Sequence, residues 1–255
     1  MLILVTNDDG VNAPGIQALA RAMMGLGRVV VAAPDRERSA VSHSLTLHHP
    51  LRIERVGEDC YSVDGTPTDC IHMGVHVILK GQKPDLIVSG INRGGNLGHN
   101  ITYSGTVWAA IEGNLMGIPS FAMSLVEAGN LDYEPAGLFA LKIGRWVERN
   151  GLPEGTILNI NVPDNPRQDL ERFTVTRQGR RQFLDSVVEK KDPRERPYFW
   201  IGGDQLPVED DAETDVGAVG RGYISVTPLH SDMTDYNALG AIRSWDGGRD
   251  GEDNT

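Results

Sequence analysis

The chain has 255 residues, of which 40% are hydrophobic, and it carries 30 glycines and a formal net charge of −11. This length suits one large domain, or one domain with an appended arm, and the glycine content suits a loop-rich globular α/β protein. An acidic chain without a basic stripe excludes a nucleic-acid polymer as partner. A small anionic substrate stays compatible with this charge, because a bound cation can invert the local field.

The sequence also predicts a cytoplasmic protein without a membrane partner. No apolar run is long enough to cross a bilayer. The N-terminus shows neither the basic region nor the small-residue cleavage site of a signal peptide. The two cysteines, Cys60 and Cys70, have no partner at metal-site spacing, and they fit a reducing compartment.

Strand and helix patterns alternate along the first part of the chain. A buried strand at 1–6 leads to a helix at 14–26, which has Pro14 in its first turn, and then to a second strand at 28–33. This βαβ opening implies parallel strands joined by a right-handed crossover. The pattern continues with a hairpin at 51–56 and 60–63, helices at 68–79, 104–116 and 135–148, and strands at 85–89, 120–124 and 157–162.

The alternation fades after residue 165. The patterns there predict hairpin strands at 171–188 and 197–201, an acidic loop at 204–215, a strand at 223–228, a short helix at 236–244 and a disordered tail at 246–255. The predicted fold is therefore α/β, a Rossmann-like doubly wound, mostly parallel sheet with a β-rich C-terminal extension. We expect three parts, namely a core at 1–165, an extension at 166–245 and the tail.

Two adjacent carboxylates follow the first strand, in the stretch Thr6-Asn7-Asp8-Asp9-Gly10. Ligands of open α/β sheets bind beyond the carboxyl ends of the strands. In a loop at that position, Asp8 and Asp9 can converge on one cation, and their oxygens suit Mg²⁺, Mn²⁺ or Ca²⁺. A plain Asp-Gly turn that caps the next helix is the alternative that this segment alone leaves open.

Two later strand ends also carry polar groups. The charged stretch 34–39 follows the second strand and offers the hydroxyl of Ser39, although this stretch by itself favours a solvated charged loop. The stretch 89–98, SGINRGGNLG, contains four glycines and the amides of Asn92 and Asn96. It matches neither the dinucleotide fingerprint nor the P-loop. A purely structural loop is the alternative, but loops in this position usually carry function.

A fourth stretch, Tyr103-Ser104-Gly105-Thr106-Val107, opens a helix. A helix N-terminus presents unpaired N–H groups and the positive end of the helix dipole, so Ser104, Gly105 and Thr106 suit a phosphate. Ser104 suits an N-cap equally well, and the two roles are compatible. Oxygen ligands at three strand ends and an anion site at one helix end together predict a metal-plus-phosphate site at the edge of the sheet.

The chain resembles the SurE family, stationary-phase survival proteins that act as 5′/3′-nucleotidases. The combination of NDDG, SGIN and YSGTV in this order is highly specific for that family. The resemblance spans nearly the whole chain and is weakest in 180–220 and the tail. The matching stretches are LVTNDDG at 4–10, APDRERSA at 33–40, VDGTPTDC at 63–70, PDLIVSGINRGGNLG at 84–98, YSGTVWAAIEG at 103–113, LNINVP at 158–163 and TPLHSDMTDY at 227–236.

This resemblance implies one divalent cation per subunit, Mg²⁺ or Mn²⁺, and a phosphate site beside it. The implied cation ligands are Asp8, Asp9, Ser39 and Asn92. The implied phosphate contacts are Asn96, Ser104, Gly105 and Thr106. It further implies a catalytic core at 1–165 and a C-terminal arm at 166–245 that forms a homodimer or homotetramer. The segment 40–43 departs from the small residues usual in the family, which bears on substrate fit more than on the cation.

The residues and the resemblance together predict metal-assisted hydrolysis of nucleoside 5′-monophosphates, with 3′-monophosphates and short polyphosphate as further substrates. Either Asp8 or Asp9 takes a proton from the attacking water, and the sequence does not select between them. Alternatives are a hydrolase of phosphodiesters, a non-catalytic sensor that binds nucleotide and metal, and an oligomeric scaffold with a vestigial site. His72 and His76 lack the glutamate of a zinc motif, so we interpret them as packing or surface residues.

Overall fold

The structure is a computed structural model that describes residues 1–126, 131–164, 170–183, 186–202, 205–207 and 211–243. Within these residues, nine strands form one sheet in the order β3-β4-β2-β1-β5-β6-β7-β13-β8. Neighbouring strands are parallel except for two antiparallel pairs, β3 with β4 and β7 with β13. The strands are β1 (Leu2–Thr6), β2 (Arg28–Pro34), β3 (Ile53–Gly57), β4 (Cys60–Val63), β5 (Leu86–Arg93), β6 (Ser120–Val126), β7 (Thr156–Pro163), β8 (Phe173–Val175) and β13 (Ile224–His230).

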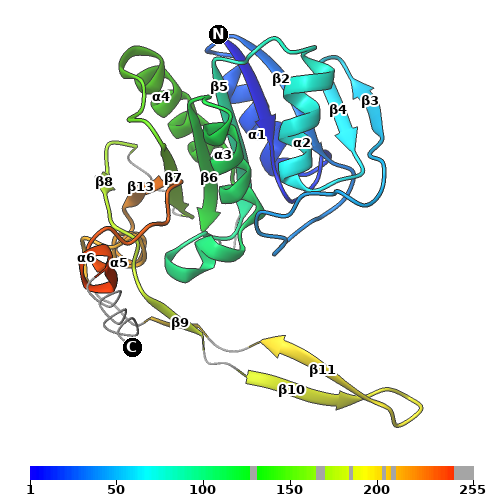
Figure 1. Ribbon diagram of the computed structural model, residues 1–255, viewed down its shortest axis with the longest axis vertical. Coiled ribbons are helices and arrows are strands. Elements are labelled where there is room, and N and C mark those ends of the chain that lie inside the picture. The colour runs from blue at the N-terminus through cyan, green and yellow to red at the C-terminus, as the bar shows by residue number, and fades with distance from the viewer. Residues whose placement is uncertain (127–130, 165–169, 184–185, 203–204, 208–210, 244–255) are drawn as a thin grey trace, which may run out of the picture.

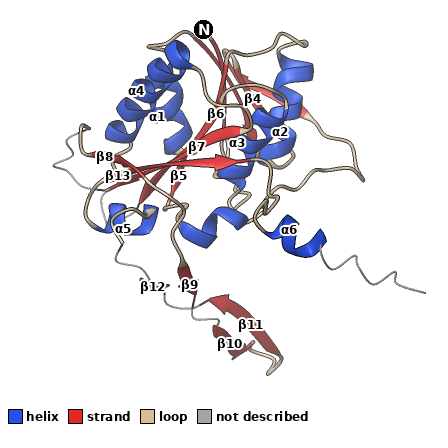
Figure 2. Ribbon diagram, turned by 60° about the vertical axis from the view of Figure 1, so that its left-hand side comes forward, coloured by secondary structure: helices blue, strands red, loops and turns tan. Residues whose placement is uncertain are grey.

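Helices cover both faces of this sheet, as the doubly wound prediction requires. Helices α1 and α4 pack together on one face, and α2 and α3 pack on the other (Figures 1 and 2). Strand β1 is buried along its whole length, and its side chains alternate between the two layers. Ile3 and Val5 join the core under α1 and α4, whereas Leu2 and Leu4 join the core under α2 and α3. The helices are α1 (Pro14–Met23), α2 (Pro67–Met73), α3 (Gly105–Leu115) and α4 (Glu134–Asn150).

Local sequence accounts for where these helices start. Pro14 opens α1, and its fixed backbone torsion suits the first turn of a helix. Helix α2 starts with a reciprocal capping box between Thr66 and Asp69. The hydroxyl of Ser104 caps α3 by accepting a hydrogen bond of 3.1 Å from the N–H of Val107. The predicted N-cap role of Ser104 is therefore confirmed.

Two predicted elements near the site have different bounds. The strand predicted to end at 89 continues as β5 to Arg93, because it pairs with β6 beyond an irregularity between Ser89 and Asn92. Gly90 permits this irregularity: its φ is +140°, and an added Cβ would lie 2.4 Å from the carbonyl oxygen of Met123. The helix predicted at 68–79 changes after Met73 into a π-helical turn at Gly74–Ile78.

The C-terminal extension divides between the sheet and a projecting arm. Strands β8 and β13 extend the main sheet, and α5 (Asp215–Gly220) packs against β13. Strands β10 (Ser186–Lys191) and β11 (Pro197–Gly202) form an antiparallel hairpin that stands away from the body (Figure 1). The single strand predicted at 171–188 is therefore three shorter ones, because β8 pairs with β13 while β9 (Arg181–Phe183) pairs with β12 (Gln205–Pro207).

Of the remaining C-terminal predictions, some are confirmed, one is changed by the structure, and some lie outside the described residues. The acidic loop predicted at 204–215 includes β12 and the start of α5, and part of it lies outside the described residues. The short helix predicted at 236–244 is present as α6 (Ala238–Arg243). The tail at 246–255 lies outside the described residues, and the division of the chain at residue 165 stays a prediction. In the part of the chain that the structure describes, no helix is long and apolar enough to cross a membrane.

Candidate functional site

The turn after β1 places the paired carboxylates. Asn7 closes this turn, since its side-chain N–H donates to the carbonyl of Gly10 at 2.9 Å and its side-chain oxygen accepts from the N–H of Gly10 at 3.2 Å. Gly10 has a φ of +101°, which a residue with a side chain adopts only with strain. Asn7 and Gly10 of the NDDG stretch thus fix the loop in which Asp8 and Asp9 lie.

Asp8 is held by the N-terminus of α3. Its carboxylate accepts hydrogen bonds from the hydroxyl of Thr106 and, at 3.2 Å, from the N–H of Thr106. The residue is only 4% exposed, and this burial raises its pKa to about 6 against the opposing effect of the Thr106 hydroxyl. A Cβ at Gly105 would lie 3.0 Å from the Cβ of Asp8. Gly105 therefore packs closely against Asp8, and Thr106 donates hydrogen bonds to it. A phosphate at this helix end would share the positive end of the helix dipole with that carboxylate.

Asp9 is tied to the neighbouring strand and is partly exposed. Its Oδ2 accepts a hydrogen bond of 3.1 Å from the N–H of Arg93, the last residue of β5. Burial raises the pKa of Asp9, the Arg93 N–H opposes that shift, and the nearby negative charge of Glu37 adds to it. The ends of β1 and β5 are thus linked directly through a carboxylate.

Asn92 and Ser39 each present an oxygen at the same edge of the sheet. The side-chain N–H of Asn92 donates to the carbonyl of Gly94 at 2.8 Å, so its oxygen is the atom that suits a cation. The hydroxyl of Ser39 donates to Glu37 at 2.8 Å, which leaves the oxygen lone pairs as the ligand. The N–H of Arg38 donates to the carbonyl of Asp8 at 2.7 Å and brings the Ser39 segment beside the first strand end.

The glycine-rich loop is held through Asn96, which is buried. The N–H of Asn96 donates to the side chain of Asn161 at 2.8 Å, and its carbonyl accepts from Asn159 at 2.8 Å and from Asn161 at 3.2 Å. Its side-chain N–H donates to the hydroxyl of Ser124 at 2.8 Å. This bond uses one of the two donors of the amide, so one donor of Asn96 is available for a phosphate oxygen.

Asn159, Asn161 and Ser124 are supporting residues that the sequence interpretation did not assign. They lie on β7 and β6, where Asn161 pairs with Ser124 in the sheet register. A signal was present in the sequence, because two asparagines two residues apart in an otherwise apolar strand lie on the same face. Buried amides in that arrangement need partners, and the loop backbone accepts from the amide N–H groups of both asparagines, while the Oδ1 of Asn159 has no partner among the described residues.

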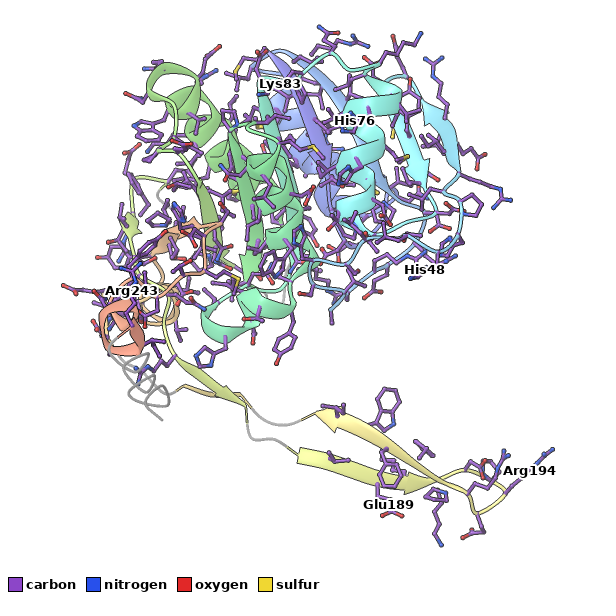
Figure 3. All side chains as sticks on the ribbon, in the orientation of Figure 1. His48, His76, Lys83, Glu189, Arg194 and Arg243 are labelled. Atoms are coloured by element: carbon purple, nitrogen blue, oxygen red, sulfur yellow. The ribbon has the colours of Figure 1, made fainter. Side chains whose placement is uncertain are left out.

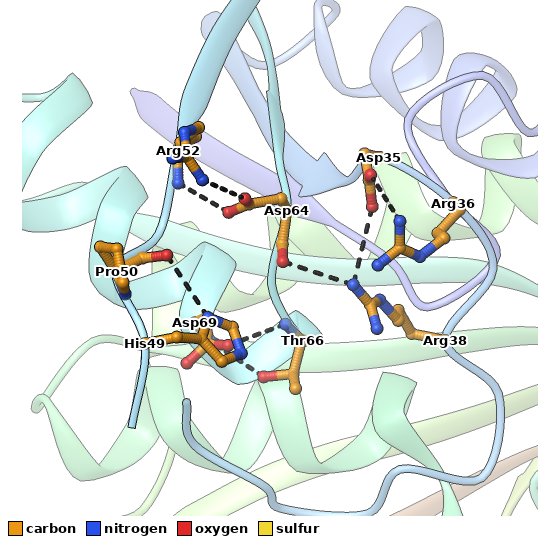
Figure 4. A network of polar contacts seen from close by, with 9 residues as sticks. All are labelled: Asp35, Arg36, Arg38, His49, Pro50, Arg52, Asp64, Thr66 and Asp69. Atoms are coloured by element: carbon orange, nitrogen blue, oxygen red, sulfur yellow. Dashed lines mark hydrogen bonds and ion pairs between the residues drawn. The ribbon is translucent and has the colours of Figure 1, made fainter. Parts of the chain in front are cut away.

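The loop after β2 is anchored on the side of α2 as well (Figure 4). The guanidinium of Arg38 donates to the carbonyl of Asp64 at 3.3 Å and lies 3.8 Å from the carboxylate of Asp35. Further along, the N–H of Thr46 donates to Asp69 at 2.9 Å. The stretch interpreted as either a ligand loop or a solvated charged loop is therefore pinned between neighbouring elements.

The donor set of this edge fits a hard divalent cation. Two adjacent carboxylates, one amide oxygen and one hydroxyl are all oxygen ligands, which Mg²⁺ and Mn²⁺ prefer. The raised pKa values of Asp8 and Asp9 indicate an environment that disfavours their negative charge, and a cation reverses that effect. Over the described ranges, no group of three or more His, Cys, Asp or Glu side chains is arranged to hold a metal. His72, which lacks the glutamate of a zinc motif in the sequence, lies beside Glu112 of α3.

Comparison with known proteins gives a consistent result. Residues 3–185 match the model of the family described as survival protein SurE. The chain is 55% identical to the 5′-nucleotidase SurE of Geotalea uraniireducens (strain Rf4), across 96% of this chain and 99% of that protein. It is also 55% identical to the 5′-nucleotidase SurE of Geobacter sulfurreducens, across 96% and 94%. The crystal structure of the SurE protein from Aquifex aeolicus superposes with a TM-score of 0.86 at 45% identity, covering 96% of this chain and all of that one.

Proposed function

The chain belongs to the SurE family, and from this premise we propose that it is a metal-dependent 5′-nucleotidase whose reaction takes place between β1, β5 and α3. The enzyme hydrolyses the phosphate ester of nucleoside 5′-monophosphates. As further substrates we propose nucleoside 3′-monophosphates and short polyphosphate. The observation that carries this assignment is the pair Asp8 and Asp9, adjacent in sequence and tied separately to α3 and β5.

The proposed cation ligands are Asp8, Asp9, Ser39 and Asn92. When bound, Mg²⁺ or Mn²⁺ supplies positive charge that polarises a phosphoryl oxygen and makes water more acidic. The chain contributes the geometry, since Thr106 orients Asp8 and the N–H of Arg93 orients Asp9. These partners fix the orientation of each carboxylate although their charges repel each other.

Asp9 is the better placed of the two carboxylates to take a proton from the attacking water. Both oxygens of Asp8 accept hydrogen bonds from Thr106, and Asp8 is buried. Asp9 is partly exposed, and the backbone N–H of Arg93 contacts only its Oδ2.

The phosphate is proposed to lie between Asn96 and the first turn of α3. The N–H groups of Ser104 and Thr106 already donate to Ile101 and Asp8, so the N–H of Gly105 and the positive end of the α3 dipole are the groups proposed to stabilise negative charge that develops on phosphoryl oxygens in the transition state. Asn96 contributes one amide donor from a backbone that Asn159 and Asn161 hold rigidly. Rigid donors cost little reorganisation when the charge develops.

Phosphate release by metal-stripped protein tests this proposal. The protein is assayed on a panel of nucleoside 5′- and 3′-monophosphates, with and without added Mn²⁺ or Mg²⁺. We expect release from the 5′-monophosphates only when metal is present. Folded protein that releases no phosphate with either metal would overturn the proposal.

A binding titration and a diester substrate, added to this assay, separate two of the alternatives from the proposed enzyme. A nucleotide-binding sensor binds nucleoside monophosphate in a titration but releases no phosphate. A phosphodiesterase cleaves bis(p-nitrophenyl) phosphate and leaves monoesters intact. The adjacent carboxylates favour the enzyme over the sensor, because a pure nucleotide binder has little need of an acidic cation site.

We further propose that the C-terminal extension, 166–245, assembles a homodimer or homotetramer. The hairpin of β10 and β11 carries large apolar side chains that are exposed. Figure 3 shows the hairpin extending away from the body, with Glu189 partway along it and Arg194 at its outer end. Apolar side chains in contact with water favour association with a complementary surface. The exposed apolar side chains of the hairpin include Val187, Val188, Phe199, Trp200 and Ile201.

A cytoplasmic location also stays a proposal. Its support is the absence of a bridge between the two cysteines: Cys60 is half-buried and Cys70 is buried, and both are free. Unpaired thiols suit a reducing compartment. Fractionation of cells that produce the tagged protein measures this directly.

A further inference from the structure

A polar cluster that the proposed reaction does not use lies between α2, α3 and the loop that follows β2. Its centre is Glu112 on α3, which is 7% exposed. The Nε2 of His43 donates to one carboxylate oxygen at 2.6 Å, and the Nε2 of His72 lies 2.8 Å from the other. The ring of His43 also stacks on Trp108, with centroids 4.8 Å apart and planes 15° from parallel. His43 thus contacts α3 with both its edge and its face.

His43 closes a short segment that starts at Ser39 and has an unfavourable backbone. Ala40 has a φ of 58° and Ser42 a φ of 53°, so two residues with side chains adopt the left-handed conformation. Such residues persist only where the surrounding contacts hold them. Without those contacts we expect the segment to relax and to move Ser39.

The contacts that hold this segment come mainly from α3 and the turn before it. The N–H of Ser42 donates to the carbonyl of Tyr103 at 3.1 Å, and its hydroxyl donates to the carbonyl of Thr102 at 2.8 Å. One residue further, His43 binds Glu112 and stacks on Trp108. Because Thr106 of the same helix holds Asp8, α3 braces two proposed cation ligands that come from different strand ends.

We propose that His43, Trp108 and Glu112 form a latch that holds Ser39 in place for the cation, which makes His43 a positioning residue for metal affinity. The inference rests on the proposed function, in which Ser39 is a ligand. The hydrogen bond from His43, and then the close approach of the His72 ring, lower the pKa of Glu112 to about 2, so its carboxylate stays charged at neutral pH. His72 touches the same carboxylate from α2, outside the Ser39 segment, and therefore has no such role.

The two histidines provide a matched pair of variants. We expect His43→Ala to weaken Mn²⁺ binding by about tenfold or more, the usual effect of losing a residue that orients a metal ligand. His72→Ala loses a contact with the same carboxylate but leaves the Ser39 segment latched, so it should bind Mn²⁺ within about twofold of wild type. The measurement is electron paramagnetic resonance of free Mn²⁺ titrated with metal-stripped protein, without nucleotide.

Further measurements separate positioning from general structural support. Thermal unfolding of the apo proteins establishes that both variants fold, and His43→Gln, which keeps a side-chain donor, should recover part of the affinity. Hydrogen exchange at residues 40–46 should be faster in His43→Ala than in His72→Ala. Equal Mn²⁺ affinity in His43→Ala and wild type, or equal losses in both alanine variants, would overturn the latch. Wild-type protein that neither binds Mn²⁺ nor releases phosphate would overturn the proposed function as well.

Discussion

The burial of polar and apolar side chains differs between two regions of the molecule. One is the rim, the edge of the sheet that carries Asp8 and Asp9, and the other is the hairpin of β10 and β11. At the rim, Asp8 is 4% exposed and its carboxylate accepts both donors of Thr106. On the hairpin, Ile201 is 94% exposed and Trp200 is 62% exposed. Charged groups are thus buried in one region of the molecule, and large apolar groups are exposed in the other.

Both arrangements are unfavourable in an isolated chain. Burial of a carboxylate disfavours its charge, as the raised pKa of Asp8 shows. Exposure of an apolar side chain forgoes about 25 cal/mol for each Å² that could be buried. We therefore expect each region to be completed by a different partner, a cation at the rim and another copy of the chain at the hairpin. We expect that damage to either region leaves the function of the other unchanged.

Asp9→Asn should give the largest effect at the rim. The change keeps the size of the side chain and removes both a cation ligand and the proposed proton acceptor. Nucleotidase activity should fall by about a thousandfold, while subunit association and the unfolding temperature stay close to wild type. The measurement is phosphate release with saturating metal, alongside light scattering for molecular mass. Asp59→Asn, at a partly exposed residue paired with Arg28, is the control and should keep full activity.

Gly105→Ala should lower the rate by displacing the carboxylate of Asp8. The new Cβ would lie 3.0 Å from the Cβ of Asp8 and 3.1 Å from its Oδ2, so the carboxylate must shift. A displacement of a catalytic group by a fraction of an ångström typically costs about ten- to hundredfold in rate. Steady-state kinetics on a nucleoside 5′-monophosphate measures this loss. Gly240→Ala, where an added Cβ meets nothing, is the control, and an equal loss in both variants would contradict the steric argument.

Glu112→Gln tests how much the charge of Glu112, in the latch on α3, contributes to the free energy of unfolding. The folded protein holds the pKa of Glu112 at about 2, below its ordinary value of 4.5, so the charge stabilises the fold above pH 4.5. That contribution is lost as the pH falls from 4.5 through 2. The variant should lose about 2 kcal/mol at pH 7, after allowance for solvent screening.

Urea unfolding of both proteins at pH 7, 4 and 3 measures this loss. The difference between wild type and Glu112→Gln should shrink steadily as the pH falls, because protonation of the unfolded chain removes the advantage of the charged form. Glu54→Gln on the exposed surface of β3 is the control. A difference that stays constant with pH would mean that packing, and not charge, explains the loss.

The double variant Phe199→Ser/Ile201→Ser should have the smallest effect on catalysis. These residues are two apart on β11, so they share one face of the hairpin. Loss of their apolar surface should lower the molecular mass in solution, while the activity per chain changes by less than about twofold. Light scattering after size exclusion gives the mass. Glu189→Ser, on the paired strand, is the control, and a large loss of activity in the double variant would show that rim and hairpin are not independent.

Much of the rim was predictable because its signals are local. Local patterns predict which strand and helix ends meet at one edge of the sheet. These patterns are the apolar run before Asp8, the cap at Ser104 and the order of the strands and helices. The continuation of β5 through Gly90 was not predictable, since it depends on pairing with β6. The bonds of Asn96 to β7 also join residues far apart in sequence. Local patterns thus indicate which groups are present, and non-local pairing decides how they are held.

The position of β13 in the sheet has a consequence for how the chain folds during synthesis. In the part of the chain that the structure describes, β13 is the sheet neighbour of β8, although about 50 residues separate Val175 from Ile224. At a synthesis rate of about 5–20 residues per second, β8 waits roughly 3–10 s for its partner. The strands from β1 to β7 are all synthesised by Pro163, about 60 residues before β13 begins at Ile224, so the nascent chain can form its rim before the last edge of the sheet closes.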